Sequence, residues 1–331
     1  MEMLSTAEND LEKAAAALVK GCLVAFPTET VYGLGADAFN RSVLARIFEA
    51  KGRPRFDPLI IHIATLETLW KIADESLLDR TTAERLSILS ERLWPGPLTL
   101  ILQKRKEVPD LATSALATAA IRFPSHPVAQ KLIRLSTGAI AAPSANLFGR
   151  LSPTRASHVK AQLGDKVDYI IDGGKTQVGV ESTVLDLSHG VPRVLRQGGT
   201  ELEKIEALIG PVEVSCASPS DAPLSPGQLK SHYAPRTPLI LCKNGELDAI
   251  PYAPGEGRLY FSHSEGVEII AERARVLSET GYVTEAAANL FDYLHELDSL
   301  GLEFIRAEEA PGCGLGEAIN DRLRRAASKS M

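Results

Sequence analysis

The stretch from Phe26 to Leu59 constrains the fold of this chain more than any other. It reads FPTETVYGLGADA, continues as a helical pattern, and ends in KGRPRFDPL. The preceding run Gly21–Phe26 is short and apolar, which predicts a buried strand that stops at Pro27. The polar residues 28–30 then stand at the carboxyl end of that strand, where open α/β sheets bind ligands.

Two further features of this stretch indicate a ligand site. Gly33 and Gly35 let the backbone turn or approach a ligand closely. The segment Lys51–Asp57 holds three cations within five residues, a composition typical of an anion-binding loop. We expect the anion to be a phosphate. The alternative is that both segments are polar surface loops, with Lys51 and Arg53 solvated.

Composition limits the class of protein. The chain has 331 residues, enough for two domains, and its 44% hydrophobic and 24% charged residues are typical of soluble proteins. No apolar run is long enough to cross a membrane, and the acidic N-terminus lacks the features of a signal peptide. We therefore expect a cytoplasmic protein with no membrane partner. The four cysteines are far apart and form no CxxC pair, which argues against a zinc site.

Charge is unevenly distributed along the chain. Residues 1–212 carry 25 basic and 24 acidic side chains, whereas residues 213–331 carry 11 basic and 18 acidic ones. The first part can still present a local basic groove. The second part has a net charge of −7 and is a poor candidate for a nucleic-acid surface.

The order of predicted elements suggests two α/β domains. Strand and helix patterns alternate along residues 1–211 with irregular connections, so we predict a twisted mixed sheet rather than a doubly wound parallel one. Residues 212–238 are rich in Ser, Pro, Ala and Asp, which is linker composition, although they end in a dense set of hydrogen-bond donors. Residues 239–331 contain further strand and helix patterns and predict a smaller α/β domain.

The common nucleotide and hydrolase motifs are missing from the sequence, which contains no GxxxxGK[ST], GxSxG or HExxH. Arg122 interrupts the apolar run TAAIRF, where a guanidinium is costly unless it is paired. Its partner is either a substrate anion or a carboxylate of the protein, and position alone does not decide. His62 lies within LIIHIA, where a histidine is more often a hydrogen-bonded core residue than a ligand.

Taken together, FPTETVYGLGADA and KGRPRFDPLIIHI resemble the YrdC-like domain of threonylcarbamoyl-AMP synthases. The resemblance covers nearly all of residues 8–212 and continues through WPGPLTLIL, TAAIRFPSHP, AAPSANLFGRLSPT, IIDGG, GVESTVLDLS and VLRQGG. SPGQLKSHYAPRTPL and GCGLGEAINDRLRRAA resemble the linker and the end of the second domain in the two-domain form of this family. The resemblance implies a YrdC-like catalytic domain at 1–211, a linker at 212–238 and a Rossmann-like domain at 239–331.

The resemblance also implies an activity. The family makes L-threonylcarbamoyladenylate from L-threonine, bicarbonate and ATP, releases pyrophosphate, and so performs the first step of tRNA threonylcarbamoyladenosine modification. Mg²⁺ is expected on the ATP phosphates, held largely by substrate and water, without a metal site of the protein's own. The expected partner is the transferase complex that passes the threonylcarbamoyl group to tRNA.

Site residues follow from the resemblance position by position. Those implied for L-threonine are Thr30, His62, Arg122, Ala142 and Ser182. Those implied for ATP are Arg53, Asp57, Thr118, Ser144, Ser152, Arg196 and Tyr233, and Lys51 and Arg53 are expected to be catalytic. The guanidinium of Arg122 would hold the threonine carboxylate with two parallel hydrogen bonds. The linker end, Ser225–Arg236, is expected to act as a lid that brings Tyr233 to the nucleotide and excludes water. The alternative is that Tyr233 only anchors the linker to one of the domains.

Two alternatives remain open at this point. YrdC-like domains also resemble double-stranded-RNA binders, but the balanced charge of residues 1–212 predicts at most weak RNA binding. A similar domain performs carbamoyl transfer in hydrogenase maturation, in proteins with acylphosphatase and zinc-finger regions that this sequence lacks. Short members of the synthase family react without a second domain, so the role of residues 239–331 is open.

Overall fold

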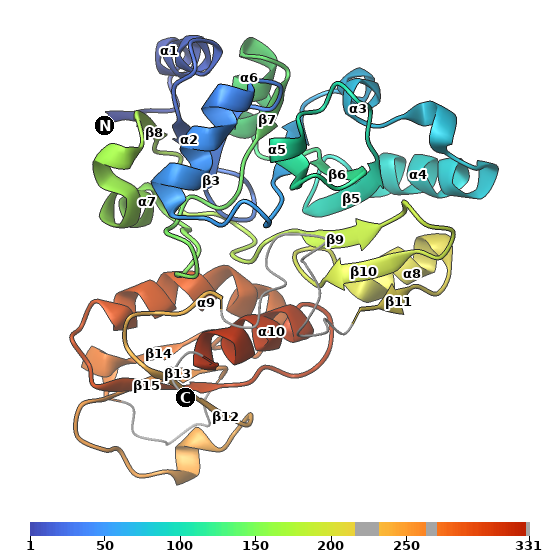
Figure 1. Ribbon diagram of the computed structural model, residues 1–331. Helices are drawn as coiled ribbons and strands as arrows, with labels where there is room; N and C mark the ends of the chain where they lie inside the picture. The colour runs from blue at the N-terminus through green and yellow to red at the C-terminus, as the bar shows by residue number, and fades with distance from the viewer. Residues whose placement is uncertain (216–231, 263–269, 329–331) are drawn as a thin grey trace.

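The computed structural model describes residues 1–215, 232–262 and 270–328, which form two sheets with covering helices (Figure 1). The strands of the larger sheet are β1 (Glu2–Leu4), β2 (Val24–Phe26), β3 (Gly33–Asp37), β4 (Ile60–Ile63), β5 (Leu98–Gln103), β6 (Thr118–Arg122), β7 (Ala139–Ala141), β8 (Tyr169–Ile171), β9 (Thr183–Asp186), β10 (Arg193–Arg196) and β11 (Glu213–Val214). Its helices are α1 (Glu8–Val19), α2 (Arg41–Lys51), α3 (Leu66–Ile72), α4 (Arg80–Leu93), α5 (Asp110–Thr113), α6 (Pro127–Leu135), α7 (Ala156–Leu163) and α8 (Leu202–Ile209).

The smaller sheet contains β12 (Leu239–Cys242), β13 (Glu256–Tyr260), β14 (Ala274–Val276) and β15 (Phe304–Glu308), covered by α9 (Val283–Asp298) and α10 (Gly316–Ala327). Short 3₁₀ turns lie at Glu75–Leu77, Gly164–Lys166, Leu247–Ala249 and Ala271–Arg273. Within the described ranges, no helix has both the length and the apolar character needed to cross a membrane.

The larger sheet is mixed, as predicted. Its strand order is β1-β8-β2-β3-β7-β4-β6-β5-β9-β10-β11. β4 pairs with β6 in parallel, whereas β2 with β3, β5 with β6, and β9 with β10 are antiparallel. The smaller sheet has the order β12-β15-β13-β14, and its pairs are parallel. The prediction of a twisted mixed α/β sheet followed by a smaller α/β domain is confirmed.

Local signals explain where helix α2 begins and where helix α1 ends. The Asn40 side chain accepts hydrogen bonds from the backbone nitrogens of Ser42 and Val43 and so caps α2. The predicted strand Gly21–Phe26 is shorter than expected and begins only at Val24. The reason is that residues 20–22 close α1. Lys20 is the C-cap, Gly21 takes a positive φ of 86°, and the Cys22 nitrogen donates to the Ala17 carbonyl.

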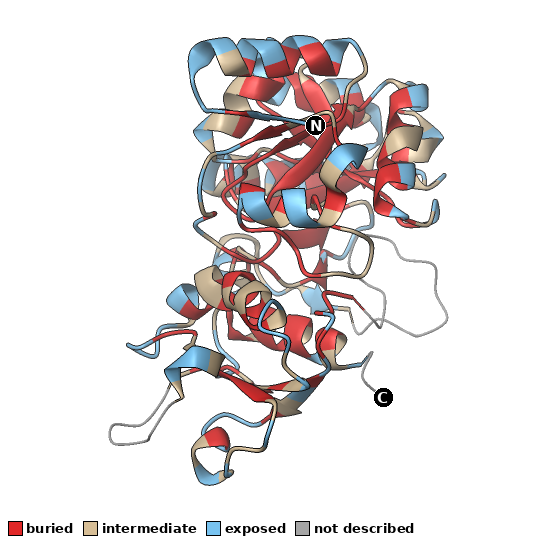
Figure 2. Cartoon of the chain, turned by 90° about the vertical axis from the view of Figure 1, so that its left-hand side faces the viewer, coloured by how far each residue is buried: buried red, intermediate tan, exposed pale blue. Residues whose placement is uncertain are grey.

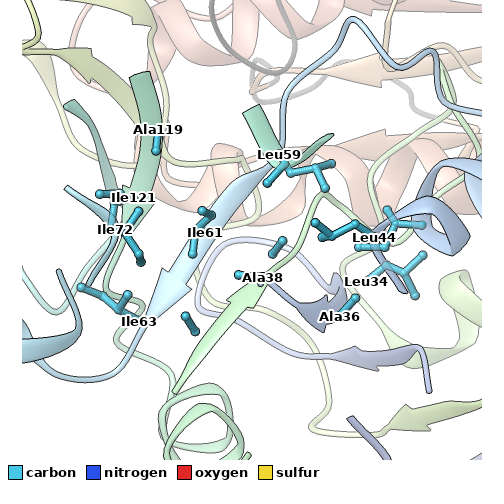
Figure 3. Close-up of a cluster of buried hydrophobic side chains, with 14 of the residues drawn as sticks. Leu34, Ala36, Ala38, Leu44, Leu59, Ile61, Ile63, Ile72, Ala119 and Ile121 are labelled. Atoms are coloured by element: carbon cyan, nitrogen blue, oxygen red, sulfur yellow. The ribbon is translucent and has the colours of Figure 1, made fainter. Parts of the chain in front are cut away.

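Side chains along β4 and β6 alternate between the apolar core and the opposite face of the sheet. Figure 3 shows Ile61 and Ile63 of β4 beside Ala119 and Ile121 of β6, all in one buried apolar cluster. Because successive strand residues point to opposite faces of a sheet, His62 and Arg122 leave this cluster on the other side. The β4–β6 register pairs the two residues directly. Both interruptions of the apolar runs therefore come together on one face.

The two domains share an apolar core. In Figure 1, α9 and α10 lie between the small sheet and the first domain. Val31, Leu151 and Val180 of the first domain belong to the same buried cluster as the inner side of α9, and Figure 2 shows the buried residues continuing into these helices. β11 falls inside the predicted linker but pairs with β10 of the first domain. Because residues 216–231 lie outside the described ranges, the boundaries at 211 and 238 stay a prediction.

A buried carboxylate also joins the domains. Asp292 of α9 is 2% exposed, and its carboxylate contacts Arg155 at 2.7 and 2.9 Å and Lys175 at 3.0 Å. Burial alone would raise the pKa of Asp292, but hydrogen bonds from the two cations outweigh it and bring that pKa down to about 2. Arg155 and Lys175 belong to the first domain, so this cluster is an electrostatic contact between domains.

Replacing Asp292 by Asn should lower the free energy of unfolding by about 2 kcal/mol, because charge-assisted hydrogen bonds are lost while the cations stay in place. Urea unfolding followed by circular dichroism measures the change. A matched control is Glu84→Gln, which removes the exposed partner of Arg80 and should change the free energy by less than about 0.5 kcal/mol. Equal stability of the Asp292→Asn and Glu84→Gln proteins would contradict the assigned role.

Candidate active site

A pocket lies on one face of β4, where β2, β6, β7 and β10 end and where β3 and β9 begin. Polar side chains converge there from segments far apart in the sequence. The predicted residues that line it are Thr30, Arg53, His62, Arg122, Ala142, Ser144, Ser182, Arg196 and Tyr233. The predicted residues that do not line it are Lys51, Asp57, Thr118 and Ser152. The structure therefore brings most of the predicted set into one place.

Arg122 has a partner within the protein. Its Nη2 lies 2.7 Å from Oε1 of Glu29, and its Nη1 donates to Oγ1 of Thr30 at 2.9 Å. Arg122 is 4% exposed and Glu29 is 4% exposed, so the ion pair is buried while the guanidinium still lines the pocket. Of the two partners considered for Arg122, a protein carboxylate is present. A substrate anion can approach only by sharing the guanidinium with Glu29.

His62 is an uncharged member of the site. Burial, followed by repulsion from Arg122, lowers the pKa of His62 to about 3, so the imidazole is neutral at ordinary pH. Its Nδ1 lies 3.3 Å from the Ile60 carbonyl oxygen, which assigns the hydrogen to Nδ1 and leaves Nε2 as an acceptor. His62 can thus accept a hydrogen bond from a hydroxyl or amine without adding charge to the pocket.

Arg53 and Arg196 form a second polar part of the pocket. Arg53 pairs with Asp57 at 2.9 Å and donates to the Pro58 carbonyl at 2.8 Å, which closes the loop on itself. Arg196 donates to the Ser182 carbonyl at 2.9 Å and to the Ser182 hydroxyl at 3.1 Å. Both guanidiniums are buried and line the pocket, and planar guanidinium groups suit phosphate oxygens.

Lys51 donates its hydrogen bonds to backbone carbonyls in this structure. Its ammonium donates to the carbonyl of Ser144 and, at 2.6 Å, to the carbonyl of Asn146. Burial, and then the neighbouring Arg53, hold the pKa of Lys51 well below its ordinary value. Of the three cations in the predicted anion-binding loop, only Arg53 lines the pocket, and Arg55 is exposed. The alternative of a solvated Lys51 and Arg53 is wrong, because both are buried.

Three other predicted residues lie behind or beside the pocket. Ser152 is fully buried and donates its hydroxyl hydrogen to Glu181 at 2.5 Å. Asp57 is fully buried in its pair with Arg53, and burial raises the pKa of its carboxyl. Thr118 begins β6 while Arg122 ends it, a separation of roughly 13 Å along a strand.

The described end of the linker reaches the pocket. Tyr233 is 1% exposed, lines the pocket, and packs against Phe291 of α9 with ring centroids 5.6 Å apart. Its φ of 61° is left-handed, which is unusual for a tyrosine and is sustained by the surrounding contacts. His232 lies beside it, and burial together with Arg53 keeps the pKa of His232 well below its ordinary value. Residues 225–231 of the predicted lid lie outside the described ranges.

Sequence reasoning missed Glu181 and Arg322, and it placed Glu29 among the polar residues 28–30 at the strand end without recognising it as the partner of Arg122. The two glutamates stand within the quoted motifs FPTETVYG and GVESTV, where an acid amid apolar and small residues was a usable signal. Arg322 occupies a buried position of α10 between Ile319 and Leu323, the same kind of signal that drew attention to Arg122. The predicted role of Gly35 is also corrected. A Cβ there would lie 2.8 Å from Phe26 and 2.9 Å from Ile140, so this glycine permits close strand packing.

Comparison with known proteins decides the family. Residues 16–198 match the family model described as Telomere recombination, and residues 200–328 match that of the threonylcarbamoyl-AMP synthase C-terminal domain. A threonylcarbamoyl-AMP synthase of Pyrococcus abyssi is 44% identical over 321 residues, covering 95% of this chain and 92% of the relative. The chain belongs to the threonylcarbamoyl-AMP synthase family. A second member, from Bacillus subtilis, is 42% identical and covers 98% of this chain and 94% of its own length.

A solved structure of the family agrees with the fold. The crystal structure of P. abyssi Sua5 complexed with L-threonine has a TM-score of 0.90 and 41% identity, covering 100% of this chain and 98% of that one. The two-domain form of the synthase family is therefore the architecture of this chain. Among the residues that the structure describes, no group of three or more His, Cys, Asp or Glu side chains could hold a metal ion.

Acidification should test the buried state of His62. Because its folded pKa lies below the ordinary 6.5, the unfolded chain binds the proton more readily below that pH. The free energy of unfolding should therefore fall as pH drops from 7 toward 4.5, with His62 contributing up to about 1.4 kcal/mol per pH unit. Urea unfolding at a series of pH values measures the slope.

The variant His62→Gln should show a shallower decline than the wild type. His189→Gln, in the exposed segment between β9 and β10, is the matched control and should keep the wild-type slope. The same pH slope in His62→Gln and wild type would show that His62 does not titrate as its burial requires.

Proposed function

We propose that this chain makes L-threonylcarbamoyladenylate from L-threonine, bicarbonate and ATP, with release of pyrophosphate. It is an L-threonylcarbamoyladenylate synthase, a nucleotidyltransferase of tRNA modification. The observation that carries the proposal is the convergence of Arg53, Arg122 and Arg196 on one pocket that also holds a neutral histidine and small hydroxyl groups. Such a pocket suits a carboxylate at one end and phosphates at the other.

The two ends of the pocket suit different substrates. Around Arg122, the residues Thr30, His62, Ala142 and Ser182 offer a charge, hydroxyl groups and a neutral acceptor for threonine. Around Arg53 and Arg196, the residues Ser144 and Tyr233 suit ATP. Lys51, Asp57 and Ser152 support these groups from behind, and contact of Thr118 with the nucleotide stays a prediction.

The reaction needs no protein nucleophile. The neutral threonine amine and bicarbonate give a carbamate with loss of water. A carbamate oxygen then attacks the α-phosphorus of ATP, and pyrophosphate leaves in line. Positioning and charge neutralisation by preorganised groups supply most of the rate enhancement in such phosphoryl chemistry. The three buried guanidiniums fit that requirement, because their ion pairs and carbonyl contacts fix them in advance.

ATP enters as its magnesium complex, with the metal on the phosphates as part of the substrate. Glu181 is the carboxylate that lines the pocket within the described residues, and Ser152 and Arg322 already engage it. The product is a mixed anhydride for a tRNA-modifying transferase complex, which is the proposed partner. Weak RNA binding by the first domain and a cytoplasmic location stay predictions.

The substrate requirement tests the proposal directly. Pyrophosphate should form only when L-threonine, bicarbonate, ATP and Mg²⁺ are all present, and omission of any one should abolish it. A coupled pyrophosphate assay with separate quantification of ADP makes the measurement. Formation of ADP and phosphate, independent of threonine, would identify an ordinary ATPase and overturn the proposal.

Arg122 tests the threonine end of the pocket. Replacing it by Ala should weaken threonine binding by about 2–4 kcal/mol, the range for one partner of a desolvated charge pair. Lys should not restore binding, because a point charge cannot reproduce the planar fork. Isothermal titration with L-threonine measures the affinity, and Arg193→Ala, from an exposed pair on β10, is the control.

Loss of Arg122 also strands the buried carboxylate of Glu29. The double variant Arg122→Met with Glu29→Gln removes both charges and so should fold while still failing to bind threonine. Wild-type threonine affinity in the folded double variant would mean that Arg122 and Glu29 serve only each other.

A further inference from the structure

One buried arginine of the second domain makes its main polar contacts with the first domain. Arg322 lies on the inner side of α10, between Ile319 and Leu323, and is 1% exposed. Its Nε donates to Oε2 of Glu181 at 3.0 Å, and its Nη1 donates to the carbonyl of Gln197 at 2.7 Å. Both acceptors belong to the first domain. Arg322 is therefore a side chain of α10 whose main polar contacts lie across the domain boundary.

Arg322 also stands over the linker. Its guanidinium carbon lies 5.3 Å from the centroid of the Tyr233 ring, close enough for a cation–π contact. Arg322 thus touches three separate segments at once, those of Glu181, Gln197 and Tyr233. Arg322 is not one of the residues that line the pocket.

Each of these three segments contains or contacts a residue that is predicted to serve ATP. Glu181 accepts the hydroxyl hydrogen of Ser152 at 2.5 Å. Gln197 directly follows Arg196, which lines the pocket at the end of β10. Tyr233 lines the pocket directly. One residue outside the pocket therefore fixes three parts of its nucleotide end.

The positive charge of Arg322 neutralises the buried carboxylate of Glu181. Glu181 is 6% exposed, and a buried carboxylate without a cation is costly. If Arg322 were uncharged, Glu181 would keep the hydrogen bond from the Ser152 hydroxyl and would draw on Arg196, a cation that also interacts with it electrostatically. Arg196 would then be pulled from Ser182 and from the phosphates that we assign to it.

We propose that Arg322 is a positioning residue for the nucleotide end of the pocket, through which the second domain sets the affinity for ATP. This inference rests on the proposed function for the identity of the nucleotide. It gives residues 239–331 a role in substrate binding that is separate from covering the first domain.

The test compares Arg322→Met with Arg324→Met, a change on the same helix at an exposed arginine paired with Glu309. Calorimetry with ATP should show affinity about tenfold or more weaker in Arg322→Met, because hydrogen bonds to charged groups are lost. Affinity for L-threonine should fall less than affinity for ATP in Arg322→Met, because Ser182 adjoins Glu181, and Arg324→Met should keep both affinities. In steady-state assays, KM for ATP should rise more than KM for threonine in Arg322→Met.

A rescue variant separates charge positioning from packing. Adding Glu181→Gln to Arg322→Met removes the stranded carboxylate and should recover part of the lost ATP affinity. Arg322→Lys keeps the charge but cannot bond Glu181 and Gln197 together, so it should fall between wild type and Arg322→Met. If Arg322→Met does not fold, Arg322→Lys carries the same comparison. Loss of ATP and threonine affinity in equal measure, with no rescue, would overturn the inference.

Hydrogen exchange without ligands keeps this test independent of the proposed function. Backbone amides near Glu181 and Tyr233 should lose protection in Arg322→Met and retain it in Arg324→Met. If the wild type releases no pyrophosphate, the proposed function fails, whereas altered exchange still supports the positioning role. Wild-type exchange together with wild-type ATP affinity in folded Arg322→Met would overturn the inference.

Discussion

Burial of guanidinium groups is the constraint on which the pocket depends. An arginine removed from water is costly unless a carboxylate or several carbonyls receive its hydrogens. In this chain each buried arginine of the region is therefore bound to a particular partner, and each partner fixes a segment. The ion pairs are Arg53–Asp57, Arg122–Glu29 and Arg322–Glu181. Because these pairs fix the direction of the donors, little reorganisation is left to the reaction.

Paired cations also shape how the pocket receives its ligands. A cluster of free positive charges would attract anions of many kinds, and would repel itself in the compact state. Here Glu29, Asp57 and Glu181 offset the charges, and two neutral histidines add polarity without charge. The pocket thus presents directed hydrogen bonds more than net charge, which fits the proposal that chemically different substrates bind at its two ends.

Part of this arrangement could be predicted from sequence. His62 and Arg122 each interrupt a short apolar run, and strand alternation requires both to leave the core. Their direct pairing could not be predicted, because the register of β4 against β6 depends on tertiary contacts. The mixed character of the sheet followed from irregular connections. The short start of β2 did not, since Gly21 and Cys22 first complete the end of α1.

Lys51 and Arg322 show where local reasoning stops. A lysine in a cation-rich loop indicates phosphate, but sequence does not show which side of that loop is buried against the Ser144 carbonyl. Arg322 and Glu181 are 141 positions apart, and neither has a local signal that names the other. Polar partners on different domains depend on how the two domains dock. That docking depends on complementary apolar surfaces, which the sequence of one domain does not reveal.

The shared core has an evolutionary consequence. Val31, Leu151 and Val180 are buried chiefly because α9 and α10 cover that side of the first domain. A protein that lost its second domain would expose these side chains as an apolar patch and would be prone to aggregate. Descent of single-domain enzymes from an ancestor of this kind would therefore require polar replacements at these positions first, or a different element to shield them.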